Sequence, residues 1–357
     1  RPRRGDDRLT FEEARGLFPV LERAAYLNAG TFGPLARPTI DAMQAELGAD
    51  GERGRLGKEY FDRVLDLRER VRAHVAHLVG VEPGQVALTG STTDGCNIVL
   101  AGLDLGPEDE ILTTTDEHPG LVLPLHVSGA RVVVADPEPE AILAAVTPRT
   151  RLLAFSHVLW TTGRVLPVQE LKAQTGLPIL VDGAQSVGVI PVEAKGLDYY
   201  TISGQKWLCG PDATGALVVA DPDGLRVRRP SYFAQTSFEP DGSFVAREGA
   251  ARFDPGWLAA SSLAGLLAAL DLAPGWRFER AAGQAARCRA LLAEKVDLVA
   301  GDATLVAFRH DDSAGVVARC AERAVLVREI PGRDLVRVSC GWWTSDDDLD
   351  RLAAALP

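Results

Sequence analysis

The chain has 357 residues, of which 46% are hydrophobic and 24% are charged, proportions typical of a globular protein with a large core and not of a disordered chain. Its 38 Lys and Arg against 49 Asp and Glu give a formal charge of −11, which disfavours nucleic acid and anionic membranes as partners. No apolar run reaches the roughly 20 residues of a membrane-spanning helix. Five scattered cysteines favour neither a disulfide framework nor a zinc site, so we expect a cytoplasmic protein.

From about residue 85 to residue 220 the chain alternates short β-branched runs with helical or polar stretches. Several runs are almost continuously apolar, as parallel strands covered on both faces are. The alternation predicts an α/β fold with a doubly wound, mostly parallel, seven-stranded sheet. The predicted strands are Gln85–Thr89, Glu110–Thr114, Arg131–Ala135, Arg151–Ser156, Pro178–Val181, Tyr199–Ile202 and Ala216–Ala220.

The alternation of short strand-like runs with helical or polar stretches ends after residue 224. A last helix is predicted to begin after Ser345, a good N-cap residue followed by three aspartates that suit the positive end of a helix. We predict a large domain over residues 19–255 and a smaller α+β domain formed by residues 1–18 and 256–357. The other predicted elements of the smaller domain are helices over Leu258–Ala273 and Arg280–Val296 and strands over Thr304–Phe308, Val325–Arg328 and Val336–Ser339.

Two polar residues follow predicted strands at the sheet edge where α/β proteins bind ligands. Asp182 ends the segment Ile-Leu-Val-Asp, and Lys206 comes shortly after Tyr199–Ile202. A lone Asp or Lys at a strand end usually acts as a cap or faces solvent. Together they match the needs of pyridoxal phosphate, which requires a lysine to hold its aldehyde as an imine and a carboxylate to keep its ring nitrogen protonated.

Two further motifs are weaker when taken alone. Thr92 and Thr93 lie where a predicted strand passes into a helix, and hydroxyl and N–H groups at a helix start suit a phosphate dianion. A hydroxyl-rich helix cap explains them equally well. His118 follows the strand Glu110–Thr114 in Asp-Glu-His-Pro, a setting more typical of a surface-loop histidine.

Taken in order, these motifs make the chain resemble the class V aminotransferase family of fold-type I pyridoxal-phosphate enzymes, which includes aminotransferases, cysteine desulfurases and isopenicillin N epimerases. The motifs are Ser-Thr-Thr-Asp-Gly at 91–95, Glu-His at 117–118, Ser-His-Val-Leu-Trp-Thr-Thr-Gly at 156–163, Asp-Gly-Ala-Gln at 182–185 and Ser-Gly-Gln-Lys at 203–206. The similarity extends from Tyr26-Leu-Asn-Ala-Gly to Arg337-Val-Ser. It implies an aspartate-aminotransferase-like fold, pyridoxal 5'-phosphate as cofactor, an amino-acid substrate and a homodimer.

The resemblance also implies a role for each matching residue around the cofactor ring. Lys206 should hold the cofactor covalently and move the proton of the substrate Cα. Asp182 should pair with the pyridinium nitrogen, and Gln185 should bond to the phenolic oxygen. His118 should stack on the ring face, with His157 near the ring oxygen.

The phosphate and the substrate have their own implied contacts. Arg337 should bind the substrate α-carboxylate through a bidentate fork, and the alternative for this arginine is a salt bridge between domains. Asn28 should line the substrate side. The residues expected to bind phosphate are Thr92, Thr93, Ser203 and Gln205.

Three departures from the family pattern bear on function. Gln205 stands where many relatives have histidine, and glutamine cannot become a cation. Trp257 occupies the place of a Gly-Thr that in relatives reaches the neighbouring subunit's phosphate, so it should form either a pocket wall or part of the core. The region Val325–Asp334 lacks the cysteine that desulfurases use to take up sulfur as a persulfide.

A carbanion at Cα opens several reactions to one site, namely transamination, racemisation, elimination and Cβ chemistry. We expect a carbon–sulfur β-lyase acting on a cysteine conjugate or sulfoxide, because the lysine and arginine are desulfurase-like and the acceptor cysteine is missing. The alternatives are an aminotransferase, an epimerase of the isopenicillin N type, and a non-catalytic cofactor-binding protein.

Overall fold

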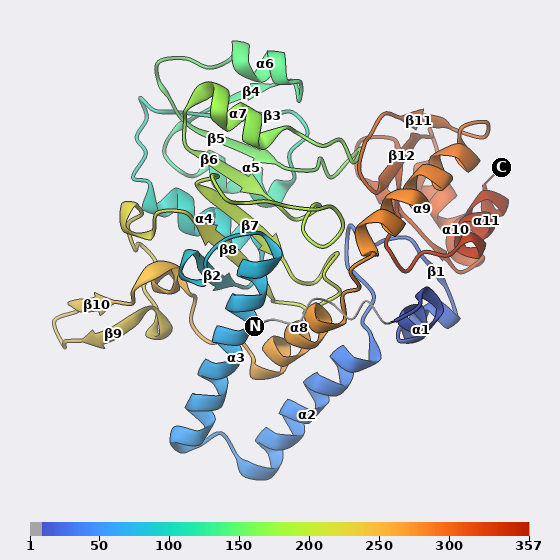
Figure 1. Ribbon diagram of the computed structural model, residues 1–357. Coiled ribbons are helices and arrows are strands. Elements are labelled where there is room, and N and C mark those ends of the chain that lie inside the picture. Colours follow the sequence, from blue (N-terminus) through green and yellow to red (C-terminus); the bar gives the residue numbers. More distant parts are fainter. Residues whose placement is uncertain (1–8, 357) are drawn as a thin grey trace.

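The computed structural model describes residues 9–356, and its centre is the predicted seven-stranded sheet (Figure 1). Across the sheet the order is β2-β8-β7-β6-β5-β3-β4. β8 runs antiparallel to the other six strands of this sheet, which are parallel to one another, so the predicted α/β class and mostly parallel sheet are confirmed. The strands are β2 Val86–Thr89, β3 Glu110–Thr114, β4 Arg131–Ala135, β5 Thr150–Ser156, β6 Ile179–Asp182, β7 Tyr199–Ser203 and β8 Gly215–Val219.

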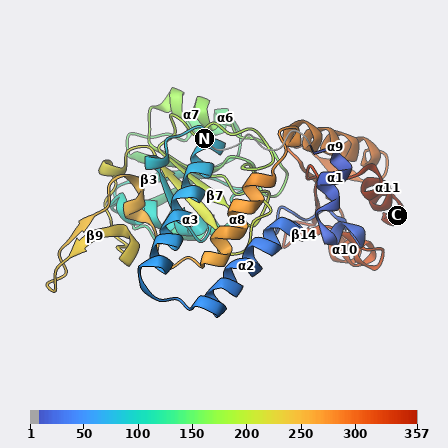
Figure 2. The same ribbon diagram turned by 60° about the horizontal axis from the view of Figure 1, so that its bottom comes forward.

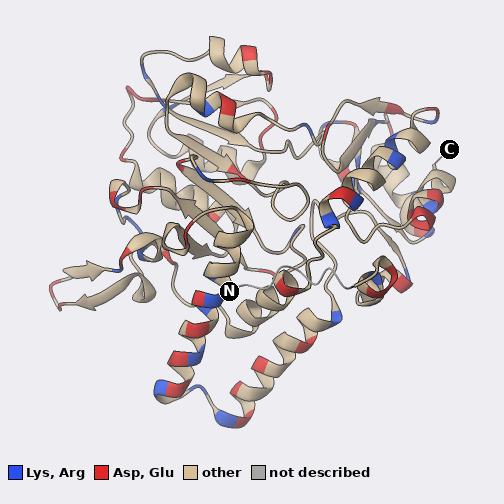
Figure 3. Cartoon of the chain, in the orientation of Figure 1, with Lys and Arg blue, Asp and Glu red and all other residues tan. Residues whose placement is uncertain are grey.

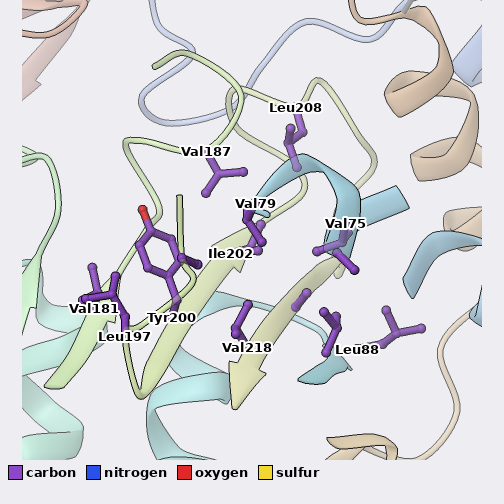
Figure 4. Packing of buried hydrophobic residues seen from close by; sticks show 14 of the residues in the cluster. Val75, Val79, Leu88, Val181, Val187, Leu197, Tyr200, Ile202, Leu208 and Val218 are labelled. Carbon is purple, nitrogen blue, oxygen red and sulfur yellow. The ribbon is translucent and has the colours of Figure 1, made fainter. Parts of the chain in front are cut away.

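Helices cover both faces of this sheet, which is why its central strands are apolar throughout. On one face α3 and α8 pack on residues such as Leu88, Val181 and Ile202, and Figure 4 shows part of this cluster. On the other face α4 and α5 pack on Ile111 and Leu180. The helices of this part of the chain are α2 Arg37–Arg53, α3 Gly57–Leu78, α4 Thr92–Gly102, α5 Pro119–His126, α6 Pro139–Ala144, α7 Val168–Thr175 and α8 Ala260–Leu272.

A second, four-stranded antiparallel sheet forms the core of the smaller part, in the order β11-β12-β15-β14. The final helix begins where predicted, with Ser345 as N-cap in a capping box with Asp348. The short helix α1, Phe11–Gly16, lies on the same side of the molecule (Figure 2). The remaining elements are α9 Arg277–Leu292, α10 Ser313–Glu322, α11 Asp346–Ala355, β11 Asp297–Val299, β12 Leu305–Arg309, β14 Arg328–Ile330 and β15 Leu335–Ser339.

The single strand predicted over Val325–Arg328 is wrong, because this segment forms two strands with different partners. β13, Val325–Leu326, pairs in parallel with β1, Ala25–Tyr26. β14 pairs with β15 in the second sheet. The chain therefore changes sheets around Val327, which an apolar run of this length does not reveal.

The hydrophobic clusters divide the chain differently from the predicted boundaries at 18/19 and 255/256. α8 belongs to the cluster of the large sheet and lies beside α2 and α3 (Figures 1 and 2). Ala25 and Leu27 belong to the cluster of the small sheet. We propose that the small domain comprises the described segment 9–27 and residues 273–356; residues 1–8 of the predicted segment 1–18 lie outside the described residues.

A hairpin that the sequence did not predict projects from the large domain (Figures 1 and 2). Its strands are β9, Gln235–Phe238, and β10, Phe244–Ala246. Figure 3 shows that acidic and basic residues alternate along α2 and α3. Of the helices in residues 9–356, none is both long enough and apolar enough to cross a bilayer.

Candidate active site

The predicted residues come together at the edge of the large sheet where its parallel strands end. Asp182 is the last residue of β6, and His157 directly follows β5. The N–H of His157 donates to the backbone oxygen of Asp182 over 3.0 Å, so the two strand ends are in register. Lys206 lies three residues beyond the end of β7, and His118 four residues beyond β3.

Lys206 and Asp182 form a buried pair within electrostatic range of each other. Burial lowers the pKa of the Lys206 amine to about 8, against an opposing effect of Asp182 and with a further lowering by Arg337. Burial raises the pKa of the Asp182 carboxyl, while Lys206 and a 2.9 Å bond from the N–H of Ala184 oppose the rise. A pKa of about 8 leaves roughly one lysine in ten neutral at pH 7, far more than at the ordinary value of 10.5, and the neutral amine is the form that reacts with an aldehyde.

His118 is the N-cap of α5, where its Nδ1 accepts the N–H of Gly120 over 3.0 Å. Burial, then the charges of Lys206, Arg337 and Arg328, lower the pKa of His118 to about 4. The imidazole is therefore neutral, which suits stacking on a cationic ring. The sequence did not single out Trp160 for this place, but its ring meets the His118 ring edge-on at 5.1 Å.

Arg337 projects from β15 of the small domain and is 2% exposed. Its Nη1 donates to the backbone oxygen of Trp160 over 2.7 Å and its Nη2 to Thr31 Oγ1 over 3.3 Å. Its Nε is buried without a partner. Burial, with Arg328 nearby, lowers the pKa of this guanidinium to about 10.

No carboxylate of the described chain pairs with Arg337, so the alternative of a domain-interface salt bridge finds no partner among residues 9–356. A buried cation with an unsatisfied donor is strained until an anion reaches it. Position 30 beside the Arg337 guanidinium requires glycine, because a Cβ there would lie 2.8 Å from Nη2 of Arg337. The site can accept a carboxylate at this guanidinium.

Asn28 acts on the site through a neighbour. Its Oδ1 accepts the Thr31 hydroxyl over 2.8 Å, and that hydroxyl in turn accepts from Arg337. Both atoms of the Gln185 amide bond to the protein, with Nε2 donating to Gly30 O over 2.8 Å and Oε1 accepting from Trp207 Nε1 over 2.9 Å. One amide hydrogen of Gln185 remains for the predicted phenolic oxygen.

The predicted phosphate residues also converge. Thr92 and Thr93 open α4, whose Ser91 cap takes the N–H of Asp94, and the first N–H groups of a helix have no partner inside it. Ser203 Oγ donates to Gln205 Oε1 over 2.8 Å, so the amide NH2 of Gln205 faces away from that bond. This donor set, next to a helix N-terminus, suits a phosphate dianion.

The structure places Trp257, which the sequence assigned either to a pocket wall or to the core, and two further tryptophans near the C-terminus. Trp257 is 54% exposed, so it is not a core residue. It lies on the surface against Tyr60 and Phe233, with ring centroids at 6.2 and 4.8 Å. Trp342 and Trp343 are buried in a cluster that joins the N-terminal segment to the small domain.

Glu117 is a site residue for which the sequence assigned no role. Its carboxylate accepts from the N–H of Ser156 over 2.9 Å and from Thr114 Oγ1 over 2.8 Å. Burial raises the pKa of Glu117 to about 7; the bonds from Ser156 and Thr114 oppose the rise, and Asp182 adds to it. In the sequence, only its position directly before His118 could have identified Glu117 as a site residue.

A lysine with a lowered pKa, a buried carboxylate beside it, a neutral histidine and a helix N-terminus at one strand edge fit pyridoxal phosphate, and together they define a fold-type I pyridoxal-phosphate enzyme. The model of the family Aminotransferase class-V matches residues 26–324. The chain belongs to this family.

Individual relatives cover nearly the whole chain. Isopenicillin N epimerase of Streptomyces clavuligerus is 30% identical, with 97% of each chain aligned. A probable cysteine desulfurase of Methanothermobacter thermautotrophicus is 29% identical over 73% of this chain and 69% of its own length. Both are similar to this chain in sequence and do not by themselves fix its reaction.

Solved structures give the same fold. The cystine C–S lyase C-DES, in complex with its product cysteine persulfide, has a TM-score of 0.88 and 29% identity over 94% of this chain and 98% of its own. Another C-DES structure holds glycine linked to its pyridoxal-phosphate cofactor, with a TM-score of 0.89 and 29% identity over 95% of this chain and 98% of that one. The Escherichia coli cysteine desulfurase CsdA, at 22% identity, has a TM-score of 0.83 over 97% of both chains and shares the fold.

Proposed function

We propose that this enzyme is a carbon–sulfur lyase that removes a sulfur leaving group from Cβ of a cysteine-derived amino acid. For a thioether R–S–CH2–CH(NH3+)–COO−, one water is consumed, and R–SH, pyruvate and ammonium are released. The observation that carries the proposal is the burial of all five cysteines, which all lie in the described part of the chain. Because no thiol is exposed to take up sulfur, the sulfur leaves with a small product.

The described residues can perform the steps such a reaction needs. Bound pyridoxal phosphate would supply a protonated ring that withdraws electrons from the substrate Cα. Asp182, as a buried anion, would hold the proton on the ring nitrogen. Lys206 has an amine pKa of about 8, which suits an acid and base that takes the Cα proton near neutral pH. Arg337 would hold the α-carboxylate and so orient the bonds at Cα.

Arg328 points to the class of substrate. It lies directly opposite Arg337 in the β14–β15 pair, and its charge lowers the pKa values of both Arg337 and His118. Its side chain is exposed and forms no ion pair with the described residues. We therefore propose a substrate with a second anionic group, as cystine has, and cystine is the compound named for the lyase C-DES.

The substitution Arg328→Met tests this second contact. A lost charge-assisted hydrogen bond corresponds to roughly a 10- to 100-fold rise in KM for cystine. The KM for S-methylcysteine, which has one carboxylate, should stay within about 2-fold. Arg309→Met, on β12 of the same sheet, is the control. Equal effects of Arg328→Met on both substrates would contradict the contact.

An epimerase is the second candidate, because the similarity to isopenicillin N epimerase extends over 97% of both chains. Inversion at Cα leaves nitrogen and sulfur in place and yields no pyruvate. A transaminase, the third possibility, converts the cofactor in one turnover and depends on a keto acid for the next. The three reactions therefore differ in their products from one substrate.

The deciding experiment incubates the holoenzyme with cystine and with cysteine S-conjugates and measures pyruvate, thiol and the cofactor spectrum together. We expect pyruvate over many turnovers, in equal amount to the released sulfur product. Lys206→Ala should abolish this turnover and leave the circular-dichroism spectrum unchanged. D-amino acid without pyruvate would establish an epimerase, and a single turnover rescued by a keto acid would establish a transaminase; either result rejects the lyase.

We also propose that the enzyme is a homodimer. Several large apolar side chains of the large domain are exposed on and near the projecting hairpin, and such a cluster marks an association surface. These residues are Tyr232, Phe238, Phe244, Val245 and Trp257. Pairing of two copies through this region would cover them.

A further inference from the structure

The carboxyl group of Glu117 joins two strand ends of the large sheet beside the candidate active site. The hydroxyl of Thr114, the last residue of β3, bonds to Glu117 Oε1 over 2.8 Å. Ser156, the last residue of β5, donates its N–H to Glu117 Oε2 over 2.9 Å, and its hydroxyl bonds to the same oxygen. All three residues are 6% exposed or less. Water therefore cannot take the place of any of these contacts.

The Ser156 N–H depends on this acceptor because the pairing of β3 with β5 has already ended. The last residue of β3 that pairs with β5 is Leu112. On the other side of β5, the N–H of His157 donates to the backbone oxygen of Asp182 over 3.0 Å. Successive N–H groups of a paired strand point to opposite sides. The Ser156 N–H therefore faces β3, and the Glu117 carboxyl takes the place of a strand carbonyl.

The segments that Glu117 fastens carry residues assigned to the surroundings of the cofactor. His118 follows Glu117 in the chain and is the N-cap of α5. His157 follows Ser156, and Ser156 lies opposite Asp182 in the β5–β6 pair. One buried carboxyl group thus fixes the segment that ends in His118 against the strand edge that carries the other two.

These contacts do not depend on whether Glu117 is charged. The Ser156 N–H can donate to a carboxylate or to the carbonyl oxygen of a carboxylic acid, and the Thr114 hydroxyl can donate or accept. The amide of glutamine offers an acceptor and a donor in the same two places. Methionine fills a similar volume and offers no group that replaces them, so it leaves a buried N–H without an acceptor.

We infer that Glu117 is a positioning residue, whose carboxyl group holds the His118 segment against the β5–β6 edge and so sets the place of the His118 ring on the cofactor. The inference rests on the proposed places of His118, His157 and Asp182 beside pyridoxal phosphate. Glu117 acts through these neighbours, which explains why a glutamate is buried directly before the histidine.

The test compares Glu117→Met and Glu117→Gln with the wild type at pH 6, where Glu117, with a pKa of about 7, is mostly uncharged. In Glu117→Met we expect the dissociation constant of pyridoxal phosphate to rise about 3- to 10-fold, the effect of one aromatic stacking contact. The circular-dichroism band of the bound cofactor should change as well, because the His118 ring moves.

The kinetic constants separate positioning from substrate binding. In Glu117→Met, kcat for pyruvate formation should fall about 10-fold or more, while KM for cystine stays within about 2-fold, since the Arg337 contact is kept. Glu117→Gln keeps the contacts with Ser156 and Thr114. It should therefore restore the cofactor band, the dissociation constant and kcat to those of the wild type.

Glu110→Met is the matched control, because Glu110 is a second buried glutamate of β3, at the end of the strand away from the site. It accepts from Arg149 Nη2 over 2.8 Å and from the Thr147 hydroxyl, both shortly before β5. Glu110→Met should therefore lower the melting temperature but leave the cofactor band, the dissociation constant and kcat unchanged.

Three results would overturn the inference: a Glu117→Met variant with the cofactor band and kcat of the wild type, a folded Glu117→Gln variant as impaired as Glu117→Met, or the same changes in Glu110→Met. Failure of the proposed lyase is a separate result, because the wild type would then form no pyruvate while the cofactor band and the dissociation constant still test Glu117. Where Glu117→Met fails to fold, Thr114→Val removes one contact of the carboxyl and should change the cofactor band in the same direction; an unchanged band would overturn the inference.

Discussion

At the scale of single residues, Glu117 makes the stability of the protein depend on pH. Its pKa rises from 4.5 to about 7 on folding, so the folded state holds a proton that the unfolded state has lost between these values. Stability therefore falls as the pH rises from about 5 to about 7, by roughly 3 kcal/mol in the free energy of unfolding, and changes no further above that range.

We expect Glu117→Gln to remove most of this slope, because an amide keeps the bond from Ser156 and the Thr114 hydroxyl can turn to accept. Urea unfolding of the holoenzyme at pH 5, 6, 7 and 8 measures the effect. Glu322→Gln, at an exposed position on α10, should keep the slope of the wild type. A wild-type stability that is flat from pH 5 to 7 would contradict the prediction.

Lys206 gives a second prediction at this scale. An amine pKa of about 8 makes the neutral fraction at pH 7 roughly 300-fold larger than at the ordinary value of 10.5. The rate at which cofactor-free protein attaches pyridoxal phosphate should therefore rise about tenfold from pH 6 to 7 and level off above 8. The absorbance of the bound cofactor measures this rate of attachment, and the reaction of free Nα-acetyl-lysine with pyridoxal phosphate is the control. A rate of attachment that keeps rising to pH 10 would show that the pKa of Lys206 is not lowered.

At the scale of elements, the first turn of α11 fixes the N-terminal segment to the small domain. Asp348 accepts the N–H of its cap residue Ser345 over 2.9 Å and pairs with Arg15 of α1, also over 2.9 Å. Asp348 is 1% exposed. Its carboxylate is therefore shared between a helix cap and an ion pair that joins two segments far apart in sequence.

Asp348→Ala should lower the free energy of unfolding by about 2–4 kcal/mol, since it removes a cap and leaves a partly buried arginine without its anion. Asp347→Ala removes an exposed carboxylate from the same turn and should cost about 0.5 kcal/mol or less. Thermal and denaturant unfolding measure the loss in the free energy of unfolding for each of the two variants. Similar losses in the two variants would show that only the charge at the helix start matters.

At the scale of the whole molecule, the proposed dimer predicts a species of twice the chain mass in light scattering. Val245→Asp, on the exposed hairpin strand β10, places a charge in the apolar surface and should shift the equilibrium toward monomer at least tenfold. Val127→Asp changes a valine that is 80% exposed elsewhere and should leave the dimer intact. A monomeric wild type at micromolar concentration would reject the proposal.

Much of the large domain could be read from the sequence because its strands are local features. An apolar run that ends in a polar residue marks both a buried strand and the residue at its edge, as for Asp182 after β6. Parallel strands place their carboxyl ends together, so Asp182 and Lys206 could be assigned to one edge, and pyridoxal phosphate to that pair, before the structure was known. The roles of His118 and His157 beside the cofactor came only from the family motifs.

What the tertiary structure decided depends on distances that no local pattern encodes. Arg337 reaches Trp160 and Thr31 only because the small domain packs against the large one, and α8 packs on the large sheet although it lies beyond residue 255, where the sequence predicted the small domain to begin. Tyr200 reads as an ordinary core residue of a buried strand. Its bond to His157 exists because glycine at 183 leaves room for a ring to cross the neighbouring strand, and that space is a property of the packed molecule.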